Sequence, residues 1–209
     1  MEVIMSQRPS WEEIFMINAI IAGIRSSCLK RQVGAVLIKD KRVIASGYNG
    51  APPGVETCLD VGECFYEALA HKDSTNGNGL GTFEILREER KIFCSAVHAE
   101  KNAINQCSIY GMSAVGAVLY ITNFPCPGCV RDIIIPNRIK HLVVWKEYLQ
   151  NKLLTHDEYS LSKHWLGQVG IGITKLDLSQ ERVKEIFGMA LTVGNRLSYR
   201  FDVPTSSLL

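Results

Sequence analysis

The chain has 209 residues, of which 46% are hydrophobic and 21% are charged. These values are ordinary for a globular protein of about one domain and exclude a chain that is disordered throughout. The formal net charge is only +2, so composition gives no support to a broad nucleic-acid or membrane-surface footprint, and we expect neither kind of partner.

The predicted elements begin with a helix. Ser10 is followed three residues later by Glu13, the capping-box pattern, and isoleucines then recur at helical spacing over residues 11–27. Two runs rich in β-forming residues, 33–38 and 42–46, flank a polar turn and predict a hairpin. Residues 54–94 then lack regular apolar spacing, apart from a charged helical segment at 83–91, and we interpret them as a loop-rich insertion.

Regular spacing returns after residue 94. It predicts helices at 98–110, 126–135, 157–167 and 181–192 and strands at 117–122, 141–145 and 171–176. Strands that alternate with helices in this way predict an α/β protein with one central sheet covered by helices.

The cellular compartment of the protein decides whether its seven cysteines can form disulfides. Residues 1–10 begin with an acidic residue and lack the basic and apolar segments of a signal peptide, and the apolar stretch 14–24 is too short to cross a membrane, which takes about 20 residues. We therefore expect a cytoplasmic protein. In that reducing compartment, clustered thiols favour metal ligation over disulfides.

Four residues form the pattern that carries chemistry. Cys126 and Cys129 lie in a Cys-x-x-Cys motif at a predicted helix start, where the helix dipole favours the thiolate form that binds metals, and His98 opens another helix. Three protein ligands leave one tetrahedral position open, as in catalytic zinc sites. Glu100 is near enough to reach a water at that position and to carry its proton. His-x-Glu with Pro-Cys-x-x-Cys is the signature of zinc nucleobase deaminases.

The cysteines allow two other interpretations. A Cys-x-x-Cys motif alone could be a thioredoxin-like redox pair, but the accompanying His98 and Glu100 favour the metal site. A closed structural zinc site would need a fourth ligand, and Cys107 lies about 13 Å along the helix from His98. We expect Cys107 to be a small core residue.

Several motifs resemble the deoxycytidylate (dCMP) deaminases of the cytidine deaminase superfamily. They are Val-Gly-Ala-Val at 33–36, Gly-Tyr-Asn-Gly at 47–50, His-Ala-Glu-Lys-Asn-Ala-Ile at 98–104, Leu-Tyr-Ile-Thr at 119–122 and Pro-Cys-Pro-Gly-Cys at 125–129. The resemblance implies a three-layer α/β/α fold with a mostly five-stranded mixed central sheet. It places a catalytic domain at 1–178, including the insertion 54–94, followed by a C-terminal helix and tail at 179–209.

The resemblance also implies roles for residues. Zinc is held by His98, Cys126 and Cys129, and Glu100 is the proton shuttle. Asn49, Ala99 and Tyr148 bind substrate, with Asn49 on the sugar hydroxyl. The alternatives are that Asn49 is a turn residue chosen for its tolerance of left-handed backbone, and that Tyr148 is structural. Arg25 and Lys146 are candidates for the 5′-phosphate, because each is a basic residue near a loop that carries a motif.

The implied activity is hydrolytic deamination of dCMP to dUMP with release of ammonia, which supplies dUMP for thymidylate synthesis. The resemblance further implies a homo-oligomer, commonly a hexamer, that is activated by dCTP and inhibited by dTTP. Two alternatives remain open: a deaminase of another cytosine or related nucleobase, and a non-catalytic nucleotide-sensing module on the same fold.

A second, structural zinc site is also expected. Cysteines at comparable places bind zinc in some relatives, and the insertion is too poor in apolar spacing to order itself by burial alone. A closed site would fix the insertion to the domain. Its candidate ligands are Cys28, Cys58, Cys64 and Cys94, with His71 as a substitute. The alternative is four separate cysteines, because their spacing matches no compact zinc ribbon.

Overall fold

A computed structural model describes residues 8–64, 94–146 and 155–198. The predicted helix at 83–91, the substitute ligand His71 and the predicted substrate residue Tyr148 lie outside these ranges. In the part of the chain that the structure describes, no helix is long and apolar enough to cross a membrane.

The centre of the fold is a five-stranded mixed sheet with the strand order β2-β1-β3-β4-β5. Strand β1 pairs antiparallel with both β2 and β3, whereas β3, β4 and β5 run parallel. The predicted mixed five-stranded sheet is therefore confirmed. The strands are β1 (Gly34–Lys39), β2 (Arg42–Tyr48), β3 (Val118–Asn123), β4 (His141–Lys146) and β5 (Gly172–Lys175).

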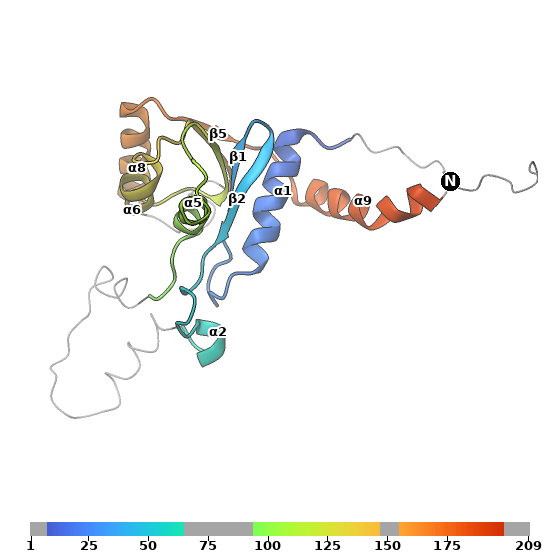
Figure 1. Ribbon diagram of the computed structural model, residues 1–209, viewed down its shortest axis with the longest axis horizontal. Helices are drawn as coiled ribbons and strands as arrows, with labels where there is room; N and C mark the ends of the chain where they lie inside the picture. The colour runs from blue at the N-terminus through green and yellow to red at the C-terminus, as the bar shows by residue number, and fades with distance from the viewer. Residues whose placement is uncertain (1–7, 65–93, 147–154, 199–209) are drawn as a thin grey trace, which may run out of the picture.

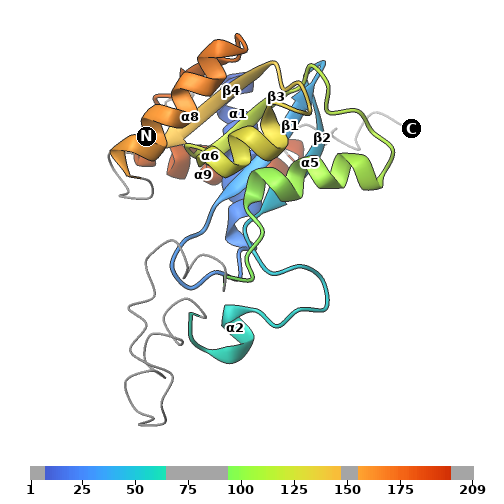
Figure 2. The ribbon, with the colours of Figure 1, turned by 90° about the vertical axis from the view of Figure 1, so that its left-hand side faces the viewer.

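Helices cover both faces of the sheet (Figure 1). Helices α1 (Trp11–Ile24) and α9 (Gln180–Ser198) lie on one face, where Met16 and Ile186 pack in one buried cluster with Val36, Tyr120 and Val143 of the sheet. The other face carries α5 (Ala99–Ile109), α6 (Pro127–Cys129), its π-helical continuation η2 (Val130–Ile134) and α8 (His156–Gln168). The short helix α2 (Cys58–Val61) lies apart from these layers (Figure 2).

Two glycines let helices approach the sheet closely. A Cβ atom on Gly34 of β1 would lie 1.8 Å from the Ala19 carbonyl oxygen of α1. A Cβ atom on Gly47 of β2 would lie 2.4 Å from the Ala103 backbone nitrogen and 2.5 Å from the Ala99 carbonyl oxygen of α5. Backbone atoms cannot retreat from such contacts, so only glycine allows both helices to sit where they do.

The predicted start of the chain is largely confirmed, although the first helix ends early. Ser10 and Glu13 form the expected capping box of α1. The helix stops at Ile24 rather than residue 27, because the Ser26 hydroxyl lies 2.7 Å from the Asn49 carbonyl oxygen and is engaged outside the helix. The hairpin turn is confirmed, and Asp40 and Lys41 have φ angles of 50° and 58°, as in a type I′ turn.

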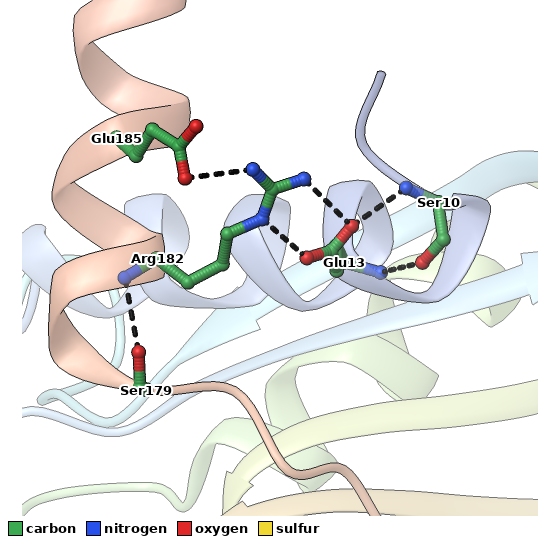
Figure 3. A network of polar contacts seen from close by, with 5 residues as sticks. All are labelled: Ser10, Glu13, Ser179, Arg182 and Glu185. Atoms are coloured by element: carbon green, nitrogen blue, oxygen red, sulfur yellow. Dashed lines mark hydrogen bonds and ion pairs between the residues drawn. The ribbon is translucent and has the colours of Figure 1, made fainter. Parts of the chain in front are cut away.

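Two later helices also differ from expectation. The predicted helix at 126–135 is a short α-helix that widens into a π-helical turn directly after Cys129. The last helix runs to Ser198 rather than residue 192. It projects beyond the body of the molecule in Figure 1. Its first turns are fixed to α1 by a polar network centred on Arg182 and Glu13 (Figure 3).

Candidate active site

Two helix starts meet on the α5 face of the sheet. His98 is the N-cap residue of α5, and Cys126 is the N-cap residue of α6, directly after strand β3. The Cys126 thiol group accepts a hydrogen bond from the Cys129 backbone N–H at 3.4 Å, so the sulfur itself caps the helix. The two segments thus present three metal-ligating side chains to one point.

The spacing of these side chains fits zinc. The ligand atoms of His98, Cys126 and Cys129 all lie within 4.8 Å of one another. His98 Nδ1 is 3.5 Å from Cys126 Sγ and 3.3 Å from Cys129 Sγ. A tetrahedral zinc with ordinary Zn–N and Zn–S bonds sets its nitrogen and sulfur ligands about 3.5 to 3.6 Å apart. The donor set and the spacing therefore both match a zinc site with three protein ligands.

The three side chains perturb one another's protonation. A hydrogen bond with Cys129 is the main cause that lowers the pKa of Cys126 to about 4, which favours the thiolate form that binds metals. A hydrogen bond with Cys126 raises the pKa of His98 to about 9. The same Cys126–Cys129 contact, together with burial, raises the pKa of Cys129.

Glu100 lies in the first turn of α5, two residues after His98, and its side chain is buried. Burial raises the pKa of this carboxyl, while the positive charge of His98 opposes the shift. A buried carboxyl next to a metal-ligating set is well suited to accept and return protons.

Helix α5 is held in place by polar side chains that the sequence analysis missed. Asn102 Nδ2 donates to the Tyr48 carbonyl oxygen at 2.7 Å, and Gln106 Oε1 accepts from the Ser46 backbone N–H at 3.1 Å. The sequence signal that could have indicated these contacts is the spacing of Asn102 and Gln106, two amide side chains four residues apart on one predicted helix. Lys101 of α5 also pairs with Asp132 of η2 at 3.5 Å, which links the two metal-ligating segments.

Asn49 fixes the loop before β1. Its Oδ1 accepts from the Val33 backbone N–H at 2.8 Å, and its Nδ2 donates to the Arg31 carbonyl oxygen at 2.9 Å. The alternative that Asn49 supplies a left-handed turn is wrong, because its φ angle is not positive. Gly50, the next residue, pairs through two backbone hydrogen bonds with Val97, so this loop lies beside the start of α5.

The other residues singled out in the sequence differ in where they lie and in how far they are buried. Ala99 is fully buried at the start of α5, and Arg25 is exposed just after α1. The backbone of Lys146 ends strand β4. Cys107 is fully buried in the hydrophobic core, which confirms its expected role.

The four cysteines of the predicted second zinc site do not converge. Among the described residues, only His98, Cys126 and Cys129 form a group of three or more metal-ligating side chains. Cys28 is half-buried, Cys58 and Cys64 are buried, and Cys94 is exposed. Because His71 lies outside the described residues, the second zinc site stays a prediction.

Residues 9–146 match the family model of the cytidine and deoxycytidylate deaminase zinc-binding region. The chain belongs to this family. Zinc is accordingly its cofactor, and the family match includes the segments that carry His98, Cys126 and Cys129.

Individual relatives agree with this membership. A deoxycytidylate deaminase of Mycobacterium phage D29 is 36% identical over 140 residues, which cover 67% of this chain and 98% of the phage protein. ComE operon protein 2 of Bacillus subtilis is 34% identical over 128 residues, and the match spans 61% of this chain but only 56% of that relative. The dCMP deaminase of cyanophage S-TIM5, crystallised with dCMP and dUMP, shares the fold, with a TM-score of 0.55 and 24% identity over 81% of this chain and 98% of that chain.

Proposed function

We propose that this protein is a zinc-dependent hydrolase that converts dCMP to dUMP and ammonia, supplying dUMP for thymidylate synthesis. The observation that carries the proposal is the convergence of His98, Cys126 and Cys129 beside the buried carboxyl of Glu100. The choice of dCMP is supported by the relative from phage D29, which is named a deoxycytidylate deaminase and is matched over nearly its whole length.

In this proposal His98, Cys126 and Cys129 hold zinc, and Glu100 moves the protons. When bound, zinc lowers the pKa of a coordinated water and so supplies a nucleophile at neutral pH. Glu100 accepts one proton of the water that attacks C4 of the pyrimidine and delivers it to N3. The same carboxylate then carries the remaining hydroxyl proton to the amino group, which leaves as ammonia.

Substrate binding falls to the loops around this centre. We assign Asn49 to the sugar hydroxyl, and the backbone pairing of Gly50 with Val97 supports this, because it keeps the Asn49 loop beside His98. The Asn49 amide also retains one N–H and a carbonyl lone pair beyond its bonds to the protein. Ala99 and Tyr148 complete the proposed contacts. Arg25, exposed in the loop that Asn49 fixes, is our candidate for the 5′-phosphate, together with Lys146.

We extend the proposal to assembly and regulation. The protein is proposed to act in the cytoplasm as a homo-oligomer, specifically a hexamer, which dCTP activates and dTTP inhibits. Sedimentation of the purified protein tests the hexamer. Assays with each nucleotide test the regulation separately from the chemistry.

The activity is tested by ammonia release from dCMP, deoxycytidine, cytidine and single-stranded DNA, using the zinc-loaded full chain. We expect dCMP to be the preferred substrate. Glu100→Gln should retain zinc and lose about 10²–10⁴-fold or more in kcat, because a proton carrier used twice is removed. Glu181→Gln, at an exposed site on α9, is the matched control and should leave kcat unchanged.

Other outcomes would redirect the proposal. Preference for another base would support the alternative deaminase. Zinc-loaded protein that binds nucleotides but releases no ammonia, with or without dCTP, would support the nucleotide-sensing module. Normal activity in Glu100→Gln would refute the proton-transfer mechanism.

A further inference from the structure

Few polar side chains are buried among the described residues, and one of them lies three residues before a ligand of the candidate metal site and has a donor group with no acceptor among the described residues. The buried polar residues are Ser26, Asn49, Glu100, Thr122, Asn123 and Ser162. Asn123 is the residue of interest, with only 9% of its surface exposed. It ends strand β3, three residues before the proposed zinc ligand Cys126.

The position of Asn123 is that of a ligand-binding residue. Asn123 pairs with Lys146 at the carboxyl ends of the parallel strands β3 and β4. In α/β sheets, ligands bind outside the carboxyl ends of parallel strands. Side chains alternate along a strand, and Leu119 and Ile121 of β3 pack in the same cluster as Ala99 and Cys129. The same alternation places Asn123 on the metal-site face of the sheet.

The orientation of the Asn123 amide is fixed by its neighbours. The Gly34 backbone N–H donates to Thr122 Oγ1 at 3.1 Å, and the Thr122 hydroxyl donates to Asn123 Oδ1 at 3.2 Å. The carbonyl end of the amide is therefore occupied. Nδ2, at the other end, makes no hydrogen bond with any residue in the described part of the chain. This donor therefore has no acceptor among the described residues, and an acceptor oxygen of a ligand would satisfy it.

We propose that Asn123 is a substrate-binding residue that donates from Nδ2 to an acceptor oxygen of the pyrimidine nucleotide. The assignment rests on the proposed function. Two groups of the substrate offer this chemistry, the O2 carbonyl of the base and the 5′-phosphate with its oxygens. Both only accept hydrogen bonds, so the site requires an amide rather than a carboxylate, which has no donor and would repel the phosphate.

Two substitutions isolate the donor. Asn123→Asp keeps the size of the side chain and an acceptor for the Thr122 hydroxyl but removes the N–H groups. Asn123→Leu removes them without adding a charge. The matched control is Asn105→Asp, at an exposed site on α5. Each variant is compared with wild type for zinc content, Tm, affinity for dUMP by calorimetry, and kcat and KM with dCMP and with deoxycytidine.

We expect Asn123→Leu to weaken dUMP binding and raise KM for dCMP by about 3- to 10-fold, the worth of one hydrogen bond. Asn123→Asp should lose more, because its negative charge faces the acceptor. Zinc content should match the wild type in both variants. Tm should stay close to wild type in Asn123→Asp, whereas Asn123→Leu should lower it, because the buried Thr122 hydroxyl loses its acceptor. An equal loss with deoxycytidine and dCMP assigns the bond to O2 of the base, and a loss confined to dCMP assigns it to the phosphate.

The assignment is overturned if Asn123→Leu binds dUMP and dCMP as wild type does. A lower Tm with unchanged dUMP affinity would also overturn it, because Asn123 would then be structural. The wild-type protein distinguishes this failure from a failure of the proposed function. If wild type neither binds dUMP nor deaminates dCMP, the activity itself is refuted and the assignment falls with it.

Discussion

Arg182 and Glu13, 169 residues apart in the chain, form a bidentate ion pair between α9 and α1. Arg182 Nε lies 2.7 Å from Glu13 Oε1, and its Nη2 lies 3.3 Å from Oε2 (Figure 3). The same carboxylate accepts from the Ser10 backbone N–H at 2.7 Å and thereby closes the capping box of α1. One side chain thus both starts the first helix and anchors the last one.

This pair predicts a dependence of stability on pH. The Arg182 hydrogen bond holds the pKa of Glu13 below its ordinary value of 4.5. Its stabilisation is therefore complete above pH 4.5 and is lost as the pH falls through the lower pKa of the folded state. Glu13→Gln should reduce the free energy of unfolding by about 1–2 kcal/mol at neutral pH, because glutamine keeps a capping-box acceptor but loses the charge.

The measurement is denaturant unfolding of wild type and Glu13→Gln at neutral pH and at an acidic pH below the lowered pKa of Glu13, where the difference should vanish. Glu185→Gln is the control, since this glutamate bonds the same arginine but its side chain is 43% exposed. Its effect should be below about 1 kcal/mol. A Glu13→Gln deficit that is equal at both pH values would contradict the ion-pair account.

The contact of Gly47 with α5 predicts a coupled loss of stability and metal binding. Gly47→Ala would drive a methyl group into the backbone at Ala99 and Ala103 and should cost about 1–3 kcal/mol or more. Because the displaced helix begins at His98, zinc affinity should fall as well. Gly167→Ala is the matched control, since Gly167 on α8 has open space around it. The stability of this variant should equal that of wild type or exceed it by up to about 1 kcal/mol. Unfolding and metal analysis measure both effects, and normal zinc affinity in Gly47→Ala would argue against the coupling.

Zinc counting separates the two predicted metal sites. Cys126→Ser and Cys129→Ala should each remove one zinc per chain and all turnover, because two protein ligands hold the metal poorly. If the second zinc site exists, wild type should hold about two zinc ions and these variants about one. The control is Cys107→Ala, a substitution in the hydrophobic core, and this variant should hold as much zinc as wild type. One zinc in the wild type would remove the second site, and an unaltered zinc content in Cys129→Ala would remove the first.

Substitution of Asn49 should affect both folding and substrate use. Asn49→Ala loses two hydrogen bonds to the backbone of the loop before β1 and should cost about 1–3 kcal/mol of stability. If Asn49 also binds the sugar, kcat/KM for dCMP should fall by a comparable free energy. Asn137→Ala is the control, because Asn137 makes a single side-chain bond to the Ile133 carbonyl oxygen and lies outside the site. An Asn49→Ala enzyme with lower stability but normal kcat/KM would leave Asn49 a purely structural residue.

The order of the elements could be predicted because the signals that define them are local. The capping box at Ser10 and the helix starts at His98 and Cys126 depend on neighbouring residues alone, and each lies where its pattern indicated. The convergence of the proposed metal ligands followed from the spacing of motifs at successive helix starts. The resemblance to a known family added the three layers and the mixed five-stranded sheet.

Contacts between distant segments could not be predicted in this way. Nothing in the sequence near Glu13 indicates that its partner is Arg182, since the pairing depends on where α9 packs. The π-helical turn after Cys129 was likewise missed, because the apolar spacing of 126–135 predicts only a helix and not its hydrogen-bond pattern. Asn123 was missed because an asparagine at a strand end is an ordinary turn signal, and its burial is visible only in the folded protein.

The amide side chains of Asn102 and Gln106 have one more effect, which concerns how copies of the protein meet. Strand β2 is the first strand of the sheet, and an exposed strand edge is a template for another chain. Its Ser46 N–H and Tyr48 carbonyl groups are already bonded to α5. A second molecule that extends the sheet across this edge must therefore first displace the Asn102 and Gln106 side chains. The same two hydrogen bonds that position the proposed proton carrier also protect the protein from edge-to-edge aggregation.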